Sequence, residues 1–447
     1  MRTKAEQALS ETFEAVATKL PGGVGIAKAR KAAIGAFAGL GLPHRRVEEW
    51  KYTDLRALLK EAFPPSVGAA RKLDAGALDA ALGALAEIDA VRLVFVDGAF
   101  APALSRLDDG HGKTYHFDPL TKGLEKNFDW LAAHIADTAG PKSTPVVALN
   151  TAFMTDGALL RVVKDGRPAK PFHLIFASSG ADKTAAAMRS FIEIGEGADA
   201  VVIESHVVVG SGAKQTNAVT EIEVLNRGRV QHIKLTSGGA AGSAHVGTWL
   251  SRLGAGSEYR AFHLTAGAPL VRNELWATFQ GEGARLDISG CFLGRGSEHI
   301  DTTLVVDHAV PACESRELFK GVLADRARGV FQGKVIVRPG AQKSDGKQMA
   351  QALMLSEEAE FDSKPELEIY ADDVVCGHGS TAAEIDENLM FYLRSRGIPP
   401  TEARAMLIES FVREALEKVE DERLREALST IAVRRLAGLS SAEDGRS

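Results

Sequence analysis

The middle of the chain, residues 166–376, carries the feature that most restricts its fold: short runs in which apolar and polar residues alternate. Helical spacing of apolar residues nearly disappears there, and only Pro269 and Pro311 stand between Pro171 and Pro339. Alternation places one set of side chains in a core and the other in solvent when the backbone is extended. We therefore predict strands at 220–225, 229–236, 244–250, 258–265, 274–279, 284–289 and 299–306.

Many short strands in succession are typical of a β-sandwich, a β-barrel or a β-solenoid. Two observations favour the solenoid. The strand-rich region is long and has no obvious break, and it holds few of the Asn-Gly or Asp-Gly pairs that form tight hairpins. Periodicity alone places the solenoid only slightly ahead of a sandwich.

Helical patterns flank the strand-rich region. Residues 4–19 and 27–38 show helical spacing of small and apolar residues, whereas 91–98 indicates a strand that runs into a turn. In the last part of the chain, Thr381 and Glu384 have the spacing of a capping box, which predicts a helix that begins there.

A second C-terminal helix is predicted after Pro399 and Pro400, and it has a wide apolar face. That face contains Met406, Leu407, Phe411, Ala415 and Val419. A helix with so wide an apolar face must be buried, either against its own domain or against a partner.

Charge and hydropathy narrow the class of protein. The chain has 53 Lys and Arg against 59 Asp and Glu, a net charge of −6, which argues against nucleic acid or an anionic membrane as the main partner. The uncharged stretch at 32–43, like every other in the chain, is shorter than the ~18 residues that a membrane span needs. Glu6, Glu11 and Glu14 near the start do not fit a secretory signal. We expect a cytoplasmic protein.

Nucleotide-binding loops are incomplete in this sequence. The Gly-Lys-Thr triplet at 112–114 has the end of a phosphate-binding loop, but Leu107 stands where the first glycine should be. The Gly-x-Gly-x-x-Ala stretch at 195–200 resembles a dinucleotide fingerprint, yet a strand pattern follows it where a helix should begin. We interpret it as a turn between strands and expect no bound nucleotide.

Candidate metal ligands are few. Three cysteines, Cys291, Cys313 and Cys376, are far apart and form no CxxC pair, so neither a disulfide framework nor a structural zinc site is indicated. Four histidines at strand positions are most simply surface or hydrogen-bonded structural residues: His206, His232, His245 and His263.

One cluster lies where the strand-rich region meets the C-terminal helices. Cys376 and His378 are two residues apart, so their side chains point to the same side of an extended backbone. Thiolate and imidazole are ligands suited to iron, zinc or copper. Two ligands do not make a site, and from spacing alone a structural turn remains the better interpretation.

Several longer segments resemble the SufB/SufD family of iron–sulfur cluster assembly scaffold proteins. They are 48–53, 321–333, 367–381 and 391–398. The resemblance extends over nearly the whole chain and is clearest at 300–415. Within the family the chain is similar to the SufD branch, because 348–355 lacks the cysteine that SufB carries on the corresponding strand, and because of the Cys-x-His-Gly pattern at 376–379.

The resemblance implies a mainly β fold: a right-handed parallel β-helix core at 166–376 between an N-terminal mixed, largely helical region at 1–165 and a C-terminal helical domain at 377–447. It implies a non-catalytic scaffold subunit of the SUF complex that supports cluster assembly and iron acquisition. The implied partners are a SufB-like paralogue, bound through the β-helices, and a SufC-like ABC ATPase. The isolated chain could instead form a homodimer.

The same resemblance assigns roles to individual residues. His378 would lie near the SufB interface and hold a transient iron–sulfur cluster or iron, with Cys376 as a weaker candidate. Met406, Leu407 and Phe411 would dock the ATPase.

Two alternatives stay open at this stage. A β-helix enzyme acting on polysaccharide would need acids or bases that line a groove on consecutive turns, whereas the acids of this region are scattered. A homodimeric scaffold without SufB is the other.

Overall fold

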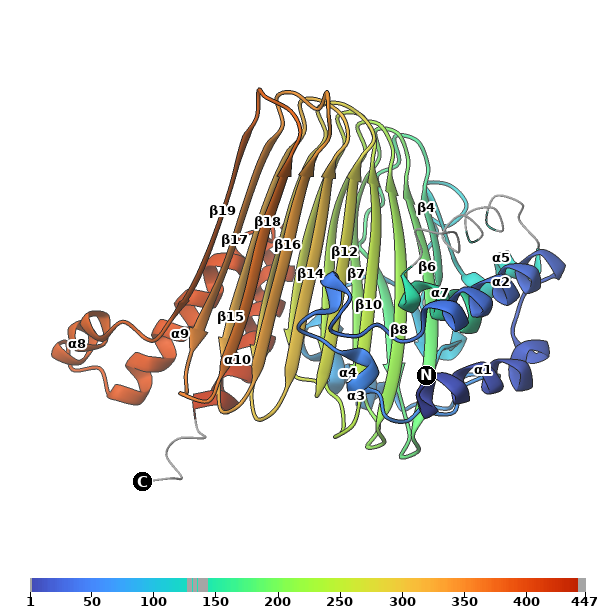
Figure 1. The fold of residues 1–447 in the computed structure, drawn as a ribbon, viewed down its shortest axis with the longest axis horizontal. Coiled ribbons are helices and arrows are strands. Elements are labelled where there is room, and N and C mark those ends of the chain that lie inside the picture. The colour runs from blue at the N-terminus through green and yellow to red at the C-terminus, as the bar shows by residue number, and fades with distance from the viewer. Residues whose placement is uncertain (1, 127–130, 132–134, 136–143, 441–447) are drawn as a thin grey trace.

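A β-solenoid forms the body of the molecule (Figure 1). The computed structural model describes residues 2–126, 131, 135 and 144–440. In that part of the chain, strands pair in parallel into a 10-stranded sheet, the first sheet, and a 9-stranded sheet, the second sheet. The chain passes from one sheet to the other after nearly every strand, so the sheets face each other around one interior. The solenoid expected from the sequence is therefore confirmed.

The strands of the first sheet are β1 (Val91–Val96), β2 (Ala99–Phe100), β5 (Phe172–Ser178), β7 (Asp199–Val208), β9 (Arg229–Ser237), β11 (Glu258–Ala266), β13 (Arg285–Gly294), β15 (Glu314–Leu323), β17 (Asp345–Met354) and β19 (Val375–Ala383). Those of the second sheet are β3 (Tyr115–Pro119), β4 (Ala158–Val162), β6 (Thr184–Ile194), β8 (Lys214–Val224), β10 (Ala244–Leu253), β12 (Leu270–Phe279), β14 (His299–His308), β16 (Arg328–Val337) and β18 (Glu360–Ile369).

The alternating residues of each predicted strand point in turn into the solenoid and away from it. In β13, Leu286, Ile288 and Phe292 point into the interior, where they join one continuous apolar core with residues of the facing sheet. Each such fully buried side chain stabilises the fold by roughly 1.5–3 kcal/mol. The turns between strands are tight: Gly197 has φ +65 between β6 and β7, which confirms that the 195–200 stretch is a turn.

Helices cover parts of both outer faces. They are α1 (Lys4–Val16), α2 (Val24–Leu40), α3 (Leu55–Leu58), α4 (Ala75–Leu82), α5 (Leu120–Glu125), α7 (Pro145–Phe153), α8 (Glu387–Ser395), α9 (Pro400–Leu416) and α10 (Glu422–Ser440). Helices α1, α2 and α7 share a core with the outer face of the second sheet. Helices α4, α9 and α10 share one with the outer face of the first sheet. No helix of the described residues is long and apolar enough to cross a membrane.

The strands of the solenoid extend beyond the middle region at both ends. Strands β1, β3 and β4 lie within 1–165, and β19 continues to Ala383. The predicted capping box is wrong, because Thr381 belongs to β19 and pairs with Gln351 of β17. The helix begins later, at Glu387, where the side chain of Asp386 accepts hydrogen bonds from two backbone amides.

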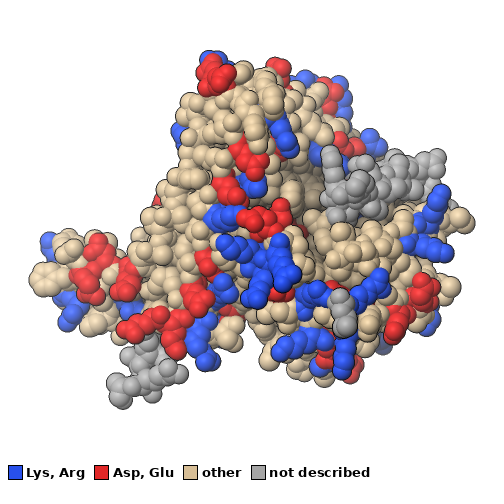
Figure 2. All heavy atoms as spheres, viewed as in Figure 1, with Lys and Arg blue, Asp and Glu red and all other residues tan. Residues whose placement is uncertain are grey.

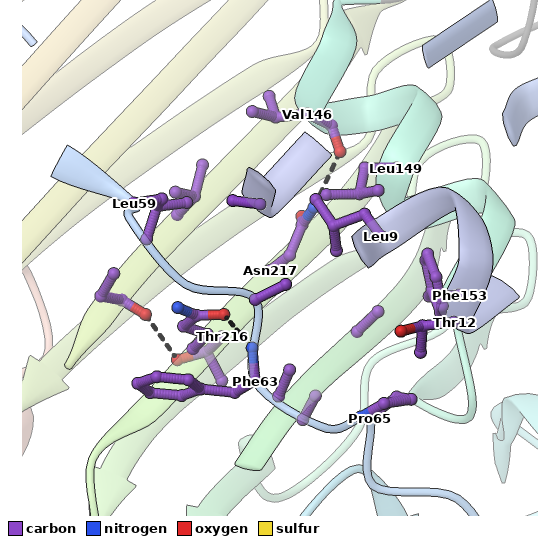
Figure 3. Close-up of a pocket in the computed structure, with 18 of the residues that line it drawn as sticks. Leu9, Thr12, Leu59, Phe63, Pro65, Val146, Leu149, Phe153, Thr216 and Asn217 are labelled. Carbon is purple, nitrogen blue, oxygen red and sulfur yellow. Dashed lines mark hydrogen bonds between the residues drawn. The ribbon is translucent and has the colours of Figure 1, made fainter. Parts of the chain in front are cut away.

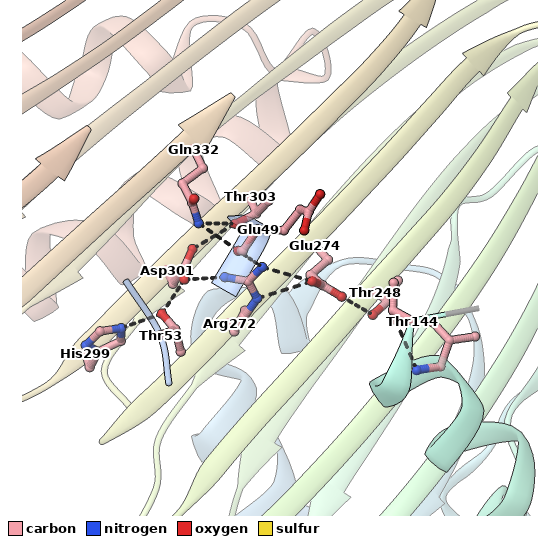
Figure 4. Close-up of polar contacts among 11 residues, drawn as sticks. Glu49, Thr53, Thr144, Thr248, Arg272, Glu274, His299, Asp301, Thr303 and Gln332 are labelled. Atoms are coloured by element: carbon pink, nitrogen blue, oxygen red, sulfur yellow. Dashed lines mark hydrogen bonds and ion pairs between the residues drawn. The ribbon is translucent and has the colours of Figure 1, made fainter. Parts of the chain in front are cut away.

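A strap, defined here as residues 48–54, crosses the outer face of the second sheet (Figure 4). Arg272 of β12 donates to the carbonyl of Glu49 (2.7 Å), and its guanidinium lies 3.8 Å from the ring centre of Trp50. The same guanidinium pairs with Asp301 and Glu274 (3.0 Å to Glu274). Trp50 is 2% exposed. The strap, which includes the family-like stretch 48–53, is therefore a packing element that joins the N-terminal region to the solenoid.

Candidate functional site

The solenoid is open at its C-terminal end. Strands β18 and β19 are the last of their sheets, and within the described residues each is paired with a neighbour on one side only. Ile369, Tyr370 and Val375 are 42%, 59% and 61% exposed at this end. An unpaired strand edge presents backbone donors and acceptors that can pair with a strand of another chain.

Cys376 and His378 both lie on the last strand, β19, with side chains on the inner side of the sheet. The Cys376 sulfur packs beside the interior core and is partly buried, whereas His378 is exposed at the open end. Burial raises the pKa of the Cys376 thiol. The expected same-side placement of the two side chains is therefore present, on a strand rather than in a turn.

The structure brings no further cysteine to this place. Cys291 is buried between β13 and α9, where burial raises the pKa of its thiol to about 12. Cys313 is buried beside Pro311 and Gly281. Among the described residues, no three His, Cys, Asp or Glu side chains are placed to hold a metal ion. Cys376 and His378 therefore have no third candidate ligand beside them in the described part of the chain.

A shallow hollow of about 430 Å³ adjoins β19. Its lining includes residues of β15, β17 and β19, among them Glu317, Gln348, Cys376 and His378, together with Lys418 beyond α9. Glu317 and Gln348 are 3% and 2% exposed. Sequence reasoning did not single them out, although both fall at inward positions of the strand alternation.

The predicted docking residues on α9 have unequal exposure. Met406 is 44% exposed, whereas Leu407 and Phe411 are half-buried. Phe411 packs against the core beneath α9, and the ammonium of Lys320 lies 4.3 Å from its ring centre.

Helix α8 presents apolar side chains more openly than α9. It stands away from the solenoid, next to α9, at the left of Figure 1. Its exposed apolar residues are Leu389, Phe391 and Tyr392, at 50%, 74% and 54%.

A second polar cluster, centred on Glu204, lies inside the closed middle of the solenoid. The Glu204 carboxylate accepts hydrogen bonds from Thr220 (3.0 Å) and the indole of Trp249 (3.1 Å), and its other oxygen lies 2.6 Å from His206 Nε2. Burial raises the pKa of Glu204, but the hydrogen bond from His206 and the nearby His232 and Lys234 outweigh it and hold that pKa well below its usual range.

The four strand histidines named from the sequence are all buried in this interior, so the surface interpretation of them is wrong. His206 and His232 are hydrogen-bonded, to Glu204 and to Tyr259. Neither ring nitrogen of His263 has a hydrogen-bond partner among the described residues. These side chains come from different turns, so only their inward position in the alternation could have pointed to burial.

An apolar cavity of about 90 Å³ lies between α1, α7 and the second sheet (Figure 3). Leu9, Leu149 and Phe153 line it on the helix side, and Asn217 of β8 donates to the carbonyl of Val146. The volume is smaller than the ~150 Å³ of an engineered cavity that holds benzene. We interpret it as a packing gap under the N-terminal helices.

Charges are mixed on the face shown in Figure 2, where basic and acidic side chains lie next to each other. Lys364, for example, pairs with Glu48 of the strap and with Glu366 of its own strand (3.2 Å to Glu366).

Comparisons with known proteins agree with this architecture. Residues 176–411 match the family described as "SUF system FeS cluster assembly, SufBD core domain", and residues 4–174 match "SufBD protein N-terminal region". The chain is 33% identical to the iron–sulfur cluster assembly protein SufD of Escherichia coli, over 89% of this chain and 90% of that protein.

Two further relatives are more distant. An iron–sulfur cluster assembly SufBD family protein of Synechocystis is 31% identical over 87% of this chain and 86% of its own length. The SufD protein of Bacillus subtilis is 27% identical over 65% of this chain and 67% of its own length. The chain thus belongs to the SufBD family of iron–sulfur cluster assembly proteins, and within it is similar to SufD.

Proposed function

We propose that this chain is a non-catalytic scaffold subunit of a cytoplasmic SUF complex, which pairs with a SufB-like paralogue and docks a SufC-like ABC ATPase. The observation that carries the proposal is the open end of the solenoid, where two unpaired strand edges meet the Cys376 and His378 pair. Because the family match covers the solenoid itself, we favour an assembly role over chemistry on polysaccharide.

The unpaired edges support pairing with a paralogue, which would add strands to both sheets. The isolated chain would satisfy the same edges by forming a homodimer. His378, exposed on β19, would then face the partner and hold iron or a nascent cluster, with Cys376 beside it. The lack of a third ligand among the described residues supports a site that both chains complete.

The exposed apolar residues of α8 and Met406 support docking of the ATPase on the C-terminal helices. ATP hydrolysis belongs to that partner in this proposal. The purified chain alone should therefore hydrolyse ATP no faster than a buffer blank. Hydrolysis above the blank should appear only when the ATPase is added.

Reconstitution from the three purified proteins tests the proposal. The complex with His378→Ala should assemble in the same proportions as wild type but form much less cluster from ferrous iron and sulfide. Size-exclusion chromatography measures assembly and visible absorbance measures cluster. A normal cluster yield in this variant would remove the proposed ligand.

Docking is tested with two substitutions of matched chemistry. Phe391→Asp on α8 should weaken ATPase binding without loss of fold, because Phe391 is 74% exposed. Phe411→Asp should weaken binding too, but it also disturbs the packing beneath Lys320. Unchanged ATPase affinity in both variants would show that these helices serve only the chain's own fold.

A further inference from the structure

Beneath His378, the inner face of the first sheet carries two polar side chains in the same register. Glu317 of β15 pairs with Gln348 of β17, and Gln348 pairs with His378 of β19. In-register residues of neighbouring parallel strands point to the same side, and the strands are about 4.8 Å apart. The three side chains therefore stack from the interior towards the open end.

Glu317 and Gln348 are buried without hydrogen bonds. Both carboxyl oxygens of Glu317 and both amide atoms of Gln348 have no partner among the described residues. Unpaired buried polar atoms are uncommon in folded proteins and each calls for an explanation. Burial also raises the pKa of Glu317 to about 8, because it outweighs the opposing effect of the nearby Arg316.

Gly333 of the facing strand β16 makes room for the amide. A Cβ at position 333 would lie 1.5 Å from Nε2 of Gln348, so any side chain there would displace Gln348. In the conformation observed, the Gln348 side chain fills the space that a side chain at position 333 would take. The amide of Gln348 therefore lies directly over Gly333, between the two sheets of the solenoid.

We propose that Gln348, with Glu317 behind it, is the positioning partner of His378. A histidine that binds a metal usually donates its other ring N–H to an oxygen acceptor, which fixes the tautomer and the ring orientation. When a partner covers the open end, Gln348 Oε1 accepts from His378, and the Gln348 amide donates to Glu317. This arrangement would pair polar atoms that are unpaired in the isolated chain.

The inference rests on the proposed function, since it assigns an orienting group to the proposed ligand His378. It adds no metal ligand to this chain. It does explain why polar side chains are placed directly under the last strand, where an apolar pair would pack at lower cost.

Gln348→Met and Gln348→Glu separate the acceptor role from packing. Met keeps the volume without an acceptor, and Glu keeps an acceptor oxygen. In the complex supplied with ferrous iron and sulfide, Gln348→Met should lower cluster yield roughly tenfold or more. Gln348→Glu should restore most of it, and the histidine nitrogen coupling in pulsed EPR of the reduced cluster should follow the same pattern.

Gln351→Met is the matched control, because Gln351 lies on the opposite side of the same strand. The inference is overturned if Gln348→Met equals this control while His378→Ala still loses cluster, a result that leaves the proposed function intact. It is also overturned if Gln348→Glu fails as badly as Gln348→Met. If His378→Ala itself has no effect, the proposed function fails and the inference fails with it.

Discussion

Two glutamates lie on the inner face of the same sheet, and their surroundings differ. Glu204, in the closed middle of the solenoid, receives hydrogen bonds from Thr220 and Trp249 and lies beside two histidines and Lys234. Glu317, near the open end, has no hydrogen-bond partner among the described residues. Accordingly the pKa of Glu204 is held well below its usual range, whereas burial raises that of Glu317 to about 8.

The difference between the two glutamates shows in which part of the solenoid buried charges are matched within the chain. In the closed part, much of the buried charge is matched within the chain, as Arg272 in the strap contact also shows. At the open end, buried polar groups and exposed strand edges occur together. The exposed strand edges and unpaired buried groups of this end support the proposal that a partner covers it.

The largest loss of stability is expected in the closed part, from Arg272→Ala. The substitution leaves Asp301 and Glu274 as buried carboxylates without a cation and removes the group that stacks on Trp50. Breaking a buried pair costs about 3–5 kcal/mol, and two carboxylates place this case at the upper end. Urea unfolding followed by tryptophan fluorescence measures it.

Arg285→Ala is the control, because Arg285 forms an exposed pair with Glu314 and should cost less than about 1 kcal/mol. Equal effects of the two substitutions would contradict the role given to the strap.

Glu204→Gln is expected to cost somewhat less, about 3 kcal/mol, because Lys234 then lies buried without its anion. The amide has nearly the same shape, so the loss reports charge and hydrogen bonding rather than volume. Unfolding in urea at pH 7 measures this change. A variant as stable as wild type would remove the contrast between the two glutamates.

Glu317→Gln, the same substitution at the open end, should have the opposite sign at alkaline pH. The unfolded chain loses the Glu317 proton near pH 4.5, but the folded chain keeps it until about pH 8. The folded state binds more protons in that window, so its stability falls as pH rises from about 4.5 to 8. Glutamine cannot ionise and escapes this loss.

The variant should therefore match wild type near pH 4 and be more stable at pH 8, by about 1.4 kcal/mol for each pKa unit of the shift. Thermal unfolding at the two pH values measures the difference. Parallel pH profiles for the two proteins would show that Glu317 is not held in its protonated form.

The smallest change in stability is expected for Phe391→Asp on α8, within about 0.5 kcal/mol, since this side chain is largely in solvent. Its effect should instead be on binding of the ATPase, measured by calorimetry. A large loss of stability would mean that α8 packs against the rest of the chain in solution.

Much of the fold follows from alternation in the sequence, because most inward side chains of the solenoid strands belong to one apolar core. The prediction failed locally at Thr381, where a helix-cap signal lies inside β19. There the pairing with β17, and a hydroxyl contact from Ser380 to Ser363 (2.6 Å), continue the strand. Strand pairing over nine residues outweighs one cap.

The candidate site could be predicted only in part. Cys376 and His378 are two residues apart, so their shared side of the strand was visible in the sequence. Glu317 and Gln348 come from earlier turns, and their stacking depends on the length of each turn. The contact of Arg272 with Trp50 joins residues 222 positions apart, and no local sequence pattern predicts such a contact.

Affinity purification of the tagged chain from its native cells, at low salt, tests the central claim most directly. The account predicts recovery of a SufB-like paralogue and an ABC-type ATPase in near-stoichiometric amounts, identified by mass spectrometry. Recovery of the chain alone, or only as a homodimer, from cells that express both proteins would contradict the proposal that the open end is completed by a partner.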